Sequence, residues 1–310
     1  MINTPILYIV FNRPDIVSKS FAKIKEVKPK QLFIAADGPR DGNTNDKVNC
    51  ENVKEIISDR LDWDCDVKYL YRDKNLGCGK AVSGAITWFF NNVEEGIILE
   101  DDCLPDLSFF NYCQELLSRY RDDKRIYTIT GSNGQKGNKR GDADYYFSRY
   151  PGIWGWATWK DRWGKFRLDL SAIDSSYTQK FLEKLFNSKA EIEYHMSCFM
   201  QIKTNKVDTW DYQWKYVVFK NEGMCATPNV NLISNIGFGE EATHTINTNN
   251  WRANLAVNRI TSPIKHPARV KINSKADKYI SKLIFQNNVK KASASKLIKD
   301  GLKYLKSFFK

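Results

Sequence analysis

The chain has 310 residues, which suits one large domain or a domain with an appendage. Its 42% hydrophobic and 27% charged residues are typical of a soluble globular protein with a sizeable core. No run of about eighteen apolar residues occurs, so we expect no bilayer-spanning segment, and the short apolar run at the N-terminus does not fit a signal peptide. The seven cysteines form no CxxC pair, which argues against a disulfide framework or a zinc site and favours reduced thiols in the cytoplasm.

The net charge of +12 is spread unevenly. Residues 275–310 carry ten lysines and two acids, a net of +8, which leaves about +4 for the rest of the chain. The basic character is therefore mainly a property of the C-terminal segment.

The first half of the chain alternates strand and helix patterns. The apolar run ILYIVF at 6–11 is typical of a strand buried on both faces of a parallel sheet, and apolar positions at helical spacing follow over 15–28. A second strand begins at residue 32 and ends in a Gly- and Pro-containing turn. Further strands are expected at 66–73, 96–102 and 126–133, with helices at about 47–61, 75–93 and 106–121.

Strands that alternate with helices of this length predict an α/β fold, with a mostly parallel sheet flanked by helices. Ligands of such sheets bind beyond the carboxyl ends of the strands. Polar residues follow all five expected strands, so we expect them to gather at one edge of the sheet. They are Asn12-Arg13, Asp37-Gly38, 72–75, 100–102 and Ser132-Asn133.

Beyond about residue 140 the pattern is less regular. Residues 150–166, YPGIWGWATWKDRWGKF, predict an aromatic loop punctuated by glycines. Helices are expected at 177–187, 189–204 and within 210–221, and a strand leading into a loop within 223–238.

The most distinctive stretch is IILEDDCLP at 97–105, where an apolar strand runs directly into Glu100, Asp101 and Asp102. Adjacent carboxylates repel one another, and a hard divalent cation such as Mg²⁺ or Mn²⁺ relieves that repulsion. At the ligand-binding edge of an α/β sheet, this indicates a metal-bound diphosphate of a nucleotide. The alternative is a solvated acidic turn before the helix at 106–121, with Asp106 or Ser108 as the N-cap.

The triplet, followed by LPDLSFFNYC, resembles the DxD-type motif of GT-A-fold glycosyltransferases, and most of all the N-acetylglucosaminyltransferase I type. Similar motifs follow in the same order along the chain. They are Arg13 in FNRPD, Asp37 in AADG, TWDYQW at 209–214 and NLISNIGFGEEATHT at 231–245. The resemblance covers roughly residues 3–250 and implies a GT-A, Rossmann-like fold.

For the donor side, the resemblance implies that Asp102 binds Mn²⁺ or Mg²⁺, that Asp101 faces the ribose or a metal-bound water, and that Glu100 contacts the donor sugar. It implies that Asp37 accepts a hydrogen bond from the uracil ring and that Arg13 approaches the nucleotide. From the residues alone, Asp37 also fits a turn-forming role and Arg13 a solvated turn.

A Gly-rich helix entry, NLGCGK, adds Asn75 and Lys80 to the candidate donor-binding residues. Free backbone N–H groups at a helix N-terminus favour anions. The spacing lacks the full phosphate-binding loop pattern, so a plain helix start explains it equally well.

For the acceptor side, the resemblance implies that Asp211 is the catalytic base that removes a proton from a sugar hydroxyl. The alternatives are an N-cap role or a partnership with Lys215 one turn on, and Asp208 is the nearest rival as the base. Trp154, Trp156 and Trp210 offer stacking faces for sugar rings, or else form a packed hydrophobic wall. His244 lies in the loop that would close over the donor diphosphate, or is exposed and inert.

The segment KLIKDGLKYLKSFFK at 296–310 predicts a basic amphipathic helix. Such a helix fits an anionic membrane surface, or else packs on the body of the protein with its lysines in solvent. The charge is not interleaved with aromatic residues as in nucleic-acid-binding motifs, so we expect no nucleic-acid partner.

These features together predict a cytoplasmic, membrane-associated or fully soluble glycosyltransferase that moves a sugar from a UDP-sugar to a glycan or lipid-linked saccharide. The alternatives are a sugar-phosphate nucleotidyltransferase and a catalytically inactive glycan-binding scaffold. We expect a glycosyltransferase domain over 1–250, divided into a nucleotide-binding part (1–135) and an acceptor-side part (136–250). A basic extension over 251–310 would follow it.

Overall fold

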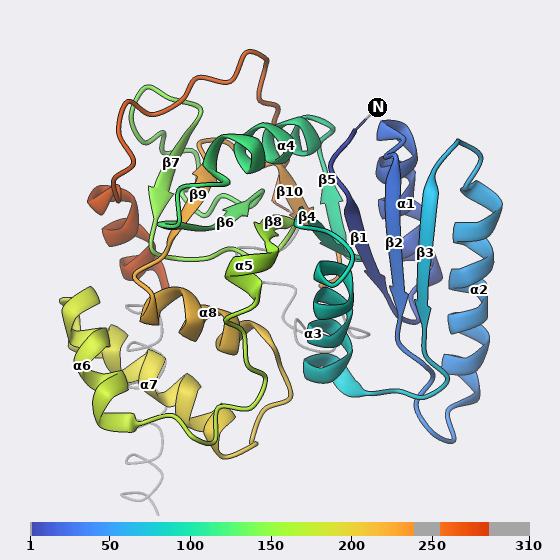
Figure 1. Ribbon diagram of the computed structural model, residues 1–310, viewed down its shortest axis with the longest axis horizontal. Coiled ribbons are helices and arrows are strands. Elements are labelled where there is room, and N and C mark those ends of the chain that lie inside the picture. The colour runs from blue at the N-terminus through green and yellow to red at the C-terminus, as the bar shows by residue number, and fades with distance from the viewer. Residues whose placement is uncertain (1, 239–254, 285–310) are drawn as a thin grey trace, which may run out of the picture.

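An eight-stranded sheet runs through the centre of the computed structural model, which describes residues 2–238 and 255–284 (Figure 1). The strand order is β3-β2-β1-β4-β8-β6-β9-β7. In chain order the strands of this sheet are β1 (Ile6–Val10), β2 (Gln31–Ala36), β3 (Asp66–Tyr71), β4 (Glu95–Glu100), β6 (Ile126–Thr130), β7 (Tyr145–Ser148), β8 (Trp156–Trp159) and β9 (Met224–Pro228). The first four strands pair in parallel, and β8 runs antiparallel between β4 and β6.

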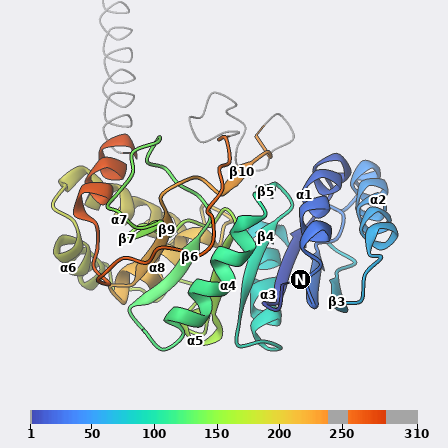
Figure 2. The same ribbon diagram turned by 90° about the horizontal axis from the view of Figure 1, so that it is seen from above.

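Helices cover both faces of the sheet. In chain order they are α1 (Pro14–Val27), α2 (Thr44–Arg60), α3 (Gly77–Phe90), α4 (Ser108–Tyr120), α5 (Lys160–Trp163), α6 (Ser175–Leu185), α7 (Lys189–Lys203) and α8 (Asp211–Lys220). One face packs under α1, α2 and α4, and the other under α3, α5 and α8. Figures 1 and 2 show α1 and α2 side by side over the β1–β3 part of the sheet.

Strand β1 illustrates why its apolar run belongs in the middle of the sheet. Because side chains alternate between the two faces of a strand, Ile6, Tyr8 and Val10 join one core cluster and Leu7 and Ile9 join the other. A strand buried on both faces has no room for an alternating polar residue. The expected α/β fold class is confirmed, with a mostly parallel, Rossmann-like sheet flanked by helices.

The strand ends gather as expected. Strands β1, β2, β3 and β4 run in parallel, and β6 has the same direction because β8 is antiparallel to both of its neighbours. The polar residues that follow these strands therefore lie at one edge of the sheet.

Two local predictions are wrong. The strand expected at 96–102 ends at Glu100, because the chain turns at Asp101-Asp102 into β5 (Cys103–Pro105), which pairs antiparallel with β10 (Ile233–Asn235). The aromatic segment 150–166 is not only a loop, since it contains β8 and α5. Strand β8 is buried on both faces, so its WATW sequence carries no alternation that would mark it as a strand.

Helices α6, α7 and α8 form a small layer beside the sheet, with boundaries close to those expected (Figure 1). Asp174 caps α6 by accepting from the Tyr177 N–H, and Ser188 caps α7 by accepting from the Glu191 N–H. Apolar residues of the three helices pack together in a third cluster.

Residues 255–284 pack on the same body. Residues 274–284 are helical, Ile272 forms a bridge with Phe147 of β7, and Gln135 Nε2 donates to the Ala276 carbonyl at 3.1 Å. The amphipathic helix predicted at 296–310 lies outside the described residues. Within the described part of the chain, every helix is too short or too polar to traverse a bilayer.

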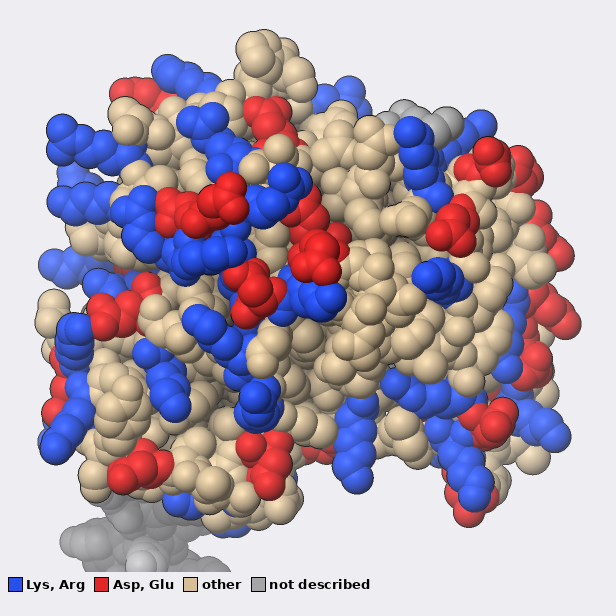
Figure 3. Space-filling model, in the orientation of Figure 1, with Lys and Arg blue, Asp and Glu red and all other residues tan. Residues whose placement is uncertain are grey.

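Charged side chains of both signs are interspersed over the face seen in Figure 3, without an extended region of one sign. This matches the concentration of the excess positive charge in residues 275–310 of the sequence.

The helix at 274–284 is attached through Asp277, and this attachment should depend on pH. The Asp277 carboxylate accepts from Ser148 Oγ at 2.6 Å and from the Arg149 N–H at 3.1 Å, and its burial raises its pKa to about 6. Between about pH 4 and 6 the native state then binds more protons than the unfolded state, so stability falls as the pH rises through this window. Relative to Asp277→Asn, the wild-type free energy of unfolding should fall across it by about 1.4 kcal/mol per unit of pKa difference, measured by urea denaturation. Parallel pH profiles for the two proteins would contradict this.

Candidate active site

Arg13, which follows β1, binds the acidic residues that follow the neighbouring strand β4. Its guanidinium forms a short ion pair with Asp101, and Nη2 lies 3.2 Å from Asp102 Oδ2. Asp101 is only 3% exposed. The side chain of Arg13 therefore offsets much of the repulsion within the triplet, a task that the sequence interpretation gave to a metal alone.

The three acids have different surroundings. Asp101 is buried against Arg13, and its contact with a ribose or a metal-bound water stays a prediction. Glu100 and Asp102 line a cavity of about 400 Å³, which we call the acidic cavity. Burial, followed by the charges of Asp102 and Asp101, raises the pKa of Glu100 to about 8.

The acidic cavity is closed by residues from distant parts of the chain. Arg13 lines it from the end of β1, and Thr209, Trp210 and Tyr212 line it from the start of α8. Asn235, at the end of β10, also lines it. None of Asn235, Thr209 and Tyr212 was predicted individually, but all three lie in the motifs TWDYQW (209–214) and NLISNIGFGEEATHT (231–245).

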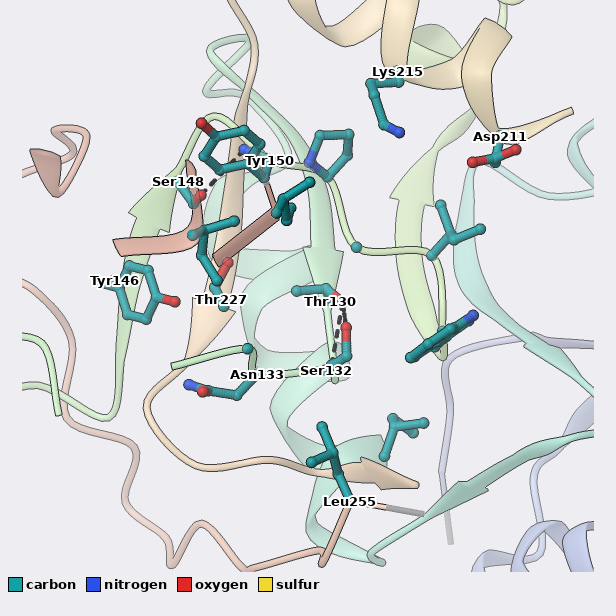
Figure 4. A pocket seen from close by; sticks show the side chains of 18 of the residues that line it. Thr130, Ser132, Asn133, Tyr146, Ser148, Tyr150, Asp211, Lys215, Thr227 and Leu255 are labelled. Carbon is teal, nitrogen blue, oxygen red and sulfur yellow. Dashed lines mark hydrogen bonds between the residues drawn. The ribbon is translucent and has the colours of Figure 1, made fainter. Parts of the chain in front are cut away.

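A second cavity, of about 290 Å³, opens beside the first (Figure 4). Its wall is rich in hydroxyl groups, so we call it the hydroxyl cavity. These groups belong to Thr130, Ser132, Tyr146, Ser148, Tyr150, Tyr194 and Thr227. Thr130, the last residue of β6, and Ser132 lie at the same edge of the sheet, and Thr130 Oγ1 is 3.0 Å from Ser132 Oγ. Ile280 and Ile284 of the helix at 274–284 add an apolar part.

Asp211 lies where the two cavities meet. Three residues, Ile153, Trp154 and Asp211, line both cavities. Asp211 is the first residue of α8, and Thr209 Oγ1 donates to its Oδ1 at 2.5 Å. Figure 4 shows its carboxylate at one side of the hydroxyl cavity, with Lys215 nearby.

The rival base, Asp208, has a structural task. Its Oδ1 accepts from the Gly79 N–H at 2.9 Å, and a Cβ on Gly79 would lie 2.6 Å from that oxygen. The N-terminus of α3 is thus satisfied by the chain's own carboxylate. Asp208 thus occupies the Gly79 N–H, and the donor-binding roles of Asn75 and Lys80 stay predictions.

The other residues of this entry also hold the local backbone. Asn75 accepts from the Gly77 N–H at 3.1 Å and donates to the Gly38 carbonyl at 3.0 Å, and Lys80 is exposed and lines neither cavity. Both carboxylate oxygens of Asp37 lie 3.1 Å from the Leu76 nitrogen. Asp37 thus takes the turn-forming role that the sequence allowed, and its contact with a uracil ring stays a prediction.

The tryptophans differ in their exposure. Trp154 is half-buried, lines both cavities and meets the Phe238 ring edge-on at 5.7 Å. Trp210 is 2% exposed and borders the acidic cavity. Trp156 is fully buried, lines neither cavity and stacks behind Trp210 at 5.7 Å, so the prediction that it presents a face to a sugar is wrong. His244 lies outside the described residues.

The residues present fit a hard divalent cation bound together with a ligand. Glu100 and Asp102 are the carboxylates that reach the acidic cavity, and Mg²⁺ or Mn²⁺ is commonly held by one or two carboxylates plus phosphate oxygens and water. Across the described ranges, no group of three or more His, Cys, Asp or Glu side chains forms a complete protein-only metal site. The arrangement thus suits a cation that arrives with a phosphate-bearing ligand.

No family model and no curated protein matches the sequence. Solved structures with a similar fold include a mannosyltransferase, PcManGT from Pyrobaculum calidifontis, in complex with GDP-Man and Mn²⁺, with 11% identity over 71% of this chain and 69% of that one (TM-score 0.40). A UDP-glucose pyrophosphorylase complexed with UDP-glucose shares 11% identity over 74% of this chain and 91% of that one (TM-score 0.36).

A third similar structure is the 4-diphosphocytidyl-2C-methyl-D-erythritol synthase of Anaerococcus prevotii, with 9% identity over 73% of this chain and 88% of that one (TM-score 0.35). None of the three is of the N-acetylglucosaminyltransferase I type. Scores and identities this low do not assign an activity to this chain.

Gly237 should be required for the geometry of the acidic cavity. The Ile236 N–H donates to the Asp102 carbonyl at 2.9 Å, and a Cβ on Gly237 would lie 2.4 Å from Asp102 Oδ2 and 2.7 Å from Arg13 Nη1. Gly237→Ala should displace this pair and lower the free energy of unfolding by about 1–3 kcal/mol, the usual cost of overpacking. Urea denaturation measures this.

The matched control is Gly84→Ala, where the added Cβ meets only the flexible end of Arg72 at 3.1 Å. It should unfold with no loss of stability relative to the wild type. Equal free energies of unfolding for the two variants would show that the Asp102–Arg13 pair tolerates displacement.

Proposed function

We propose that the protein is a metal-dependent glycosyltransferase. It moves a sugar from a nucleotide-diphosphate donor, with a UDP-sugar expected, to a hydroxyl of a glycan or lipid-linked saccharide. The observation that carries the proposal is the position of Asp211, which lines both the acidic cavity and the hydroxyl cavity. A group-transfer enzyme needs its proton acceptor at the point where the two substrates meet.

The acidic cavity suits the donor. Glu100 and Asp102 supply oxygen ligands for Mn²⁺ or Mg²⁺, and Arg13 adds a fixed positive charge beside them. When bound, the cation would neutralise the charge that develops on the departing diphosphate. Asp37 remains the proposed uracil contact and His244 the proposed contact of the closing loop, both on resemblance to the N-acetylglucosaminyltransferase I type.

The hydroxyl cavity suits the acceptor. Threonine, serine and tyrosine hydroxyls can both donate to and accept from sugar hydroxyls, and Trp154 adds an aromatic surface at the junction. Asp211 would remove the proton of the attacking hydroxyl in a single displacement with inversion. Thr209, which donates to Asp211 at 2.5 Å, fixes the orientation of this carboxylate.

Two alternatives use the same sheet. A sugar-phosphate nucleotidyltransferase would be expected to have a longer Gly-rich loop after β1, where this chain has FNRPD. A glycan-binding scaffold would not require carboxylates at a donor cavity. The cavity arrangement favours the transferase, because a second, hydroxyl-rich cavity borders the acidic one at Asp211.

The proposed setting is the cytoplasmic side of a membrane. The basic segment at 296–310 would hold the enzyme near lipid-linked or nascent surface glycans, with no nucleic-acid partner. We also propose that the chain divides into a glycosyltransferase domain (1–250) and a basic extension (251–310).

Asp102→Ala should abolish both sugar transfer and the stabilisation by UDP with Mn²⁺. The carboxylate faces the acidic cavity, so its loss removes a cation ligand without removing core volume. Thermal melting with UDP and Mn²⁺ measures binding, and release of UDP from UDP-sugars measures turnover. The control is Asp64→Ala in the exposed loop before β3. This variant should retain both sugar transfer and the stabilisation by UDP with Mn²⁺. Unchanged turnover in Asp102→Ala, or a preference for UTP with a sugar 1-phosphate, would overturn the proposal.

The variants Asp211→Asn and Asp208→Asn should show which of the two carboxylates is the catalytic base. Loss of the base at Asp211 should lower kcat by about 10²- to 10⁴-fold. Asp208→Asn should keep its activity and lose up to about 1 kcal/mol of stability at the N-terminus of α3. Steady-state kinetics and thermal melting on both variants measure this, and a larger loss of kcat in Asp208→Asn would reverse the assignment.

A further inference from the structure

Lys215 is the cation of the hydroxyl cavity. It lies on α8 one turn after Asp211, and Figure 4 shows its ammonium group at the rim of the cavity. The residues found to line this cavity include no other lysine and no arginine. His195 also lines it, but burial lowers the pKa of His195 and so favours its neutral form.

Within the described ranges, no carboxylate forms an ion pair with the Lys215 ammonium. Asp211 is the nearest acid along α8, yet the two side chains form no ion pair within 4.0 Å. The Lys215 ammonium lies over the ring of Tyr212, whose centroid is 4.9 Å away. A half-buried cation with an aromatic contact but no anion is available to pair with a negatively charged ligand.

The rest of the cavity restricts that ligand. At about 290 Å³ the cavity is at the small end of ligand pockets, which suits a terminal saccharide unit rather than a long chain. Seven hydroxyl-bearing residues surround this volume, as a polyhydroxylated ring requires. Trp154 and the carboxylate of Asp211 lie on the side that borders the acidic cavity.

Tyr150 is held in place on the cavity wall. Its hydroxyl donates to the buried carboxylate of Glu191 in a short hydrogen bond, and Ser281 Oγ donates to the other Glu191 oxygen at 2.6 Å. The carboxylate of Glu191, on α7, is thereby bonded to Tyr150 and to Ser281 of the helix at 274–284. It does not line the cavity and so leaves the charge of Lys215 available to a ligand.

We propose that the hydroxyl cavity binds an acidic saccharide acceptor, whose carboxylate or phosphate group pairs with Lys215 while a neighbouring hydroxyl faces Asp211. This rests on the proposed function and adds to it the charge class of the acceptor. The ion pair fixes the orientation of the acceptor ring, because Lys215 and Asp211 are one helical turn apart on the same rigid element. A neutral sugar fits the cavity but leaves the ammonium without a partner.

The test compares acidic and neutral probes with the full-length protein. The probes are p-nitrophenyl glucuronide, glucose 6-phosphate and p-nitrophenyl glucoside, with binding followed by saturation-transfer NMR. We expect the wild type to bind at least one acidic probe 10- to 100-fold more tightly than the glucoside, the range for a charge-assisted contact. Preference for the glucuronide assigns a carboxylate, and preference for glucose 6-phosphate assigns a phosphate. Equal binding of all three overturns the proposal.

Lys215→Met keeps the length of the side chain and removes the charge. It should weaken binding of the acidic probe 10- to 100-fold and binding of the glucoside by less than threefold. Lys215→Arg should restore much of the preference for the acidic probe. The matched control is Lys220→Met, which replaces an exposed lysine of the same helix that lies outside the cavity. This variant should bind all probes as the wild type does. An equal loss for acidic and neutral probes in Lys215→Met would show that Lys215 acts on Asp211 or on packing, and would overturn the proposal.

Failure of this inference can be told apart from failure of the proposed function. The thermal shift of the wild type with UDP and Mn²⁺ reports on the acidic cavity and involves no acceptor. A positive shift with no preference for acidic probes rejects the acceptor class alone, whereas no shift rejects the transferase.

Discussion

The pairing of Arg13 with Asp101 and Asp102 is the interaction on which the site depends. Three successive carboxylates at a strand end repel one another, and burial of the middle one would be prohibitive without a fixed counter-charge. Arg13 supplies it because β1 and β4 are hydrogen-bonded neighbours whose ends lie at the same edge of the sheet. Asp101 is buried in this way, whereas Glu100 and the Arg13-bound Asp102 line the acidic cavity.

The second half of the chain turns this acidic edge into a two-sided site. Strand β10 pairs with β5 and carries Asn235 and Gly237 to Asp102, while the turn before α8 carries Asp211 to the junction of the cavities. The helix at 274–284 forms part of the hydroxyl cavity through Ile280 and Ile284. The acceptor-side wall therefore includes residues on both sides of position 250.

Several polar residues near this edge serve the architecture. Asp208 satisfies the N-terminus of α3, Asp37 and Asn75 hold the turn before that helix, and Asp277 ties the helix at 274–284 to β7. A carboxylate that already accepts backbone N–H groups has fewer lone pairs for a ligand. Location near the sheet edge is thus a weaker guide to function than an unpaired side chain that borders a cavity.

The sequence alone determined the fold class and the edge at which the site lies. Buried strands such as ILYIVF are apolar on both faces, helices repeat every 3.6 residues, and both patterns are local properties of the chain. It also located the acidic triplet and Asp211. Tertiary structure alone decided which acid is paired and which is open, that Asp208 caps α3, that Trp156 is buried, and that Lys215 borders a cavity. These outcomes depend on contacts such as Arg13 with Asp101, or Gly79 with Asp208, between residues 88 and 129 positions apart, for which the local pattern carries no signal.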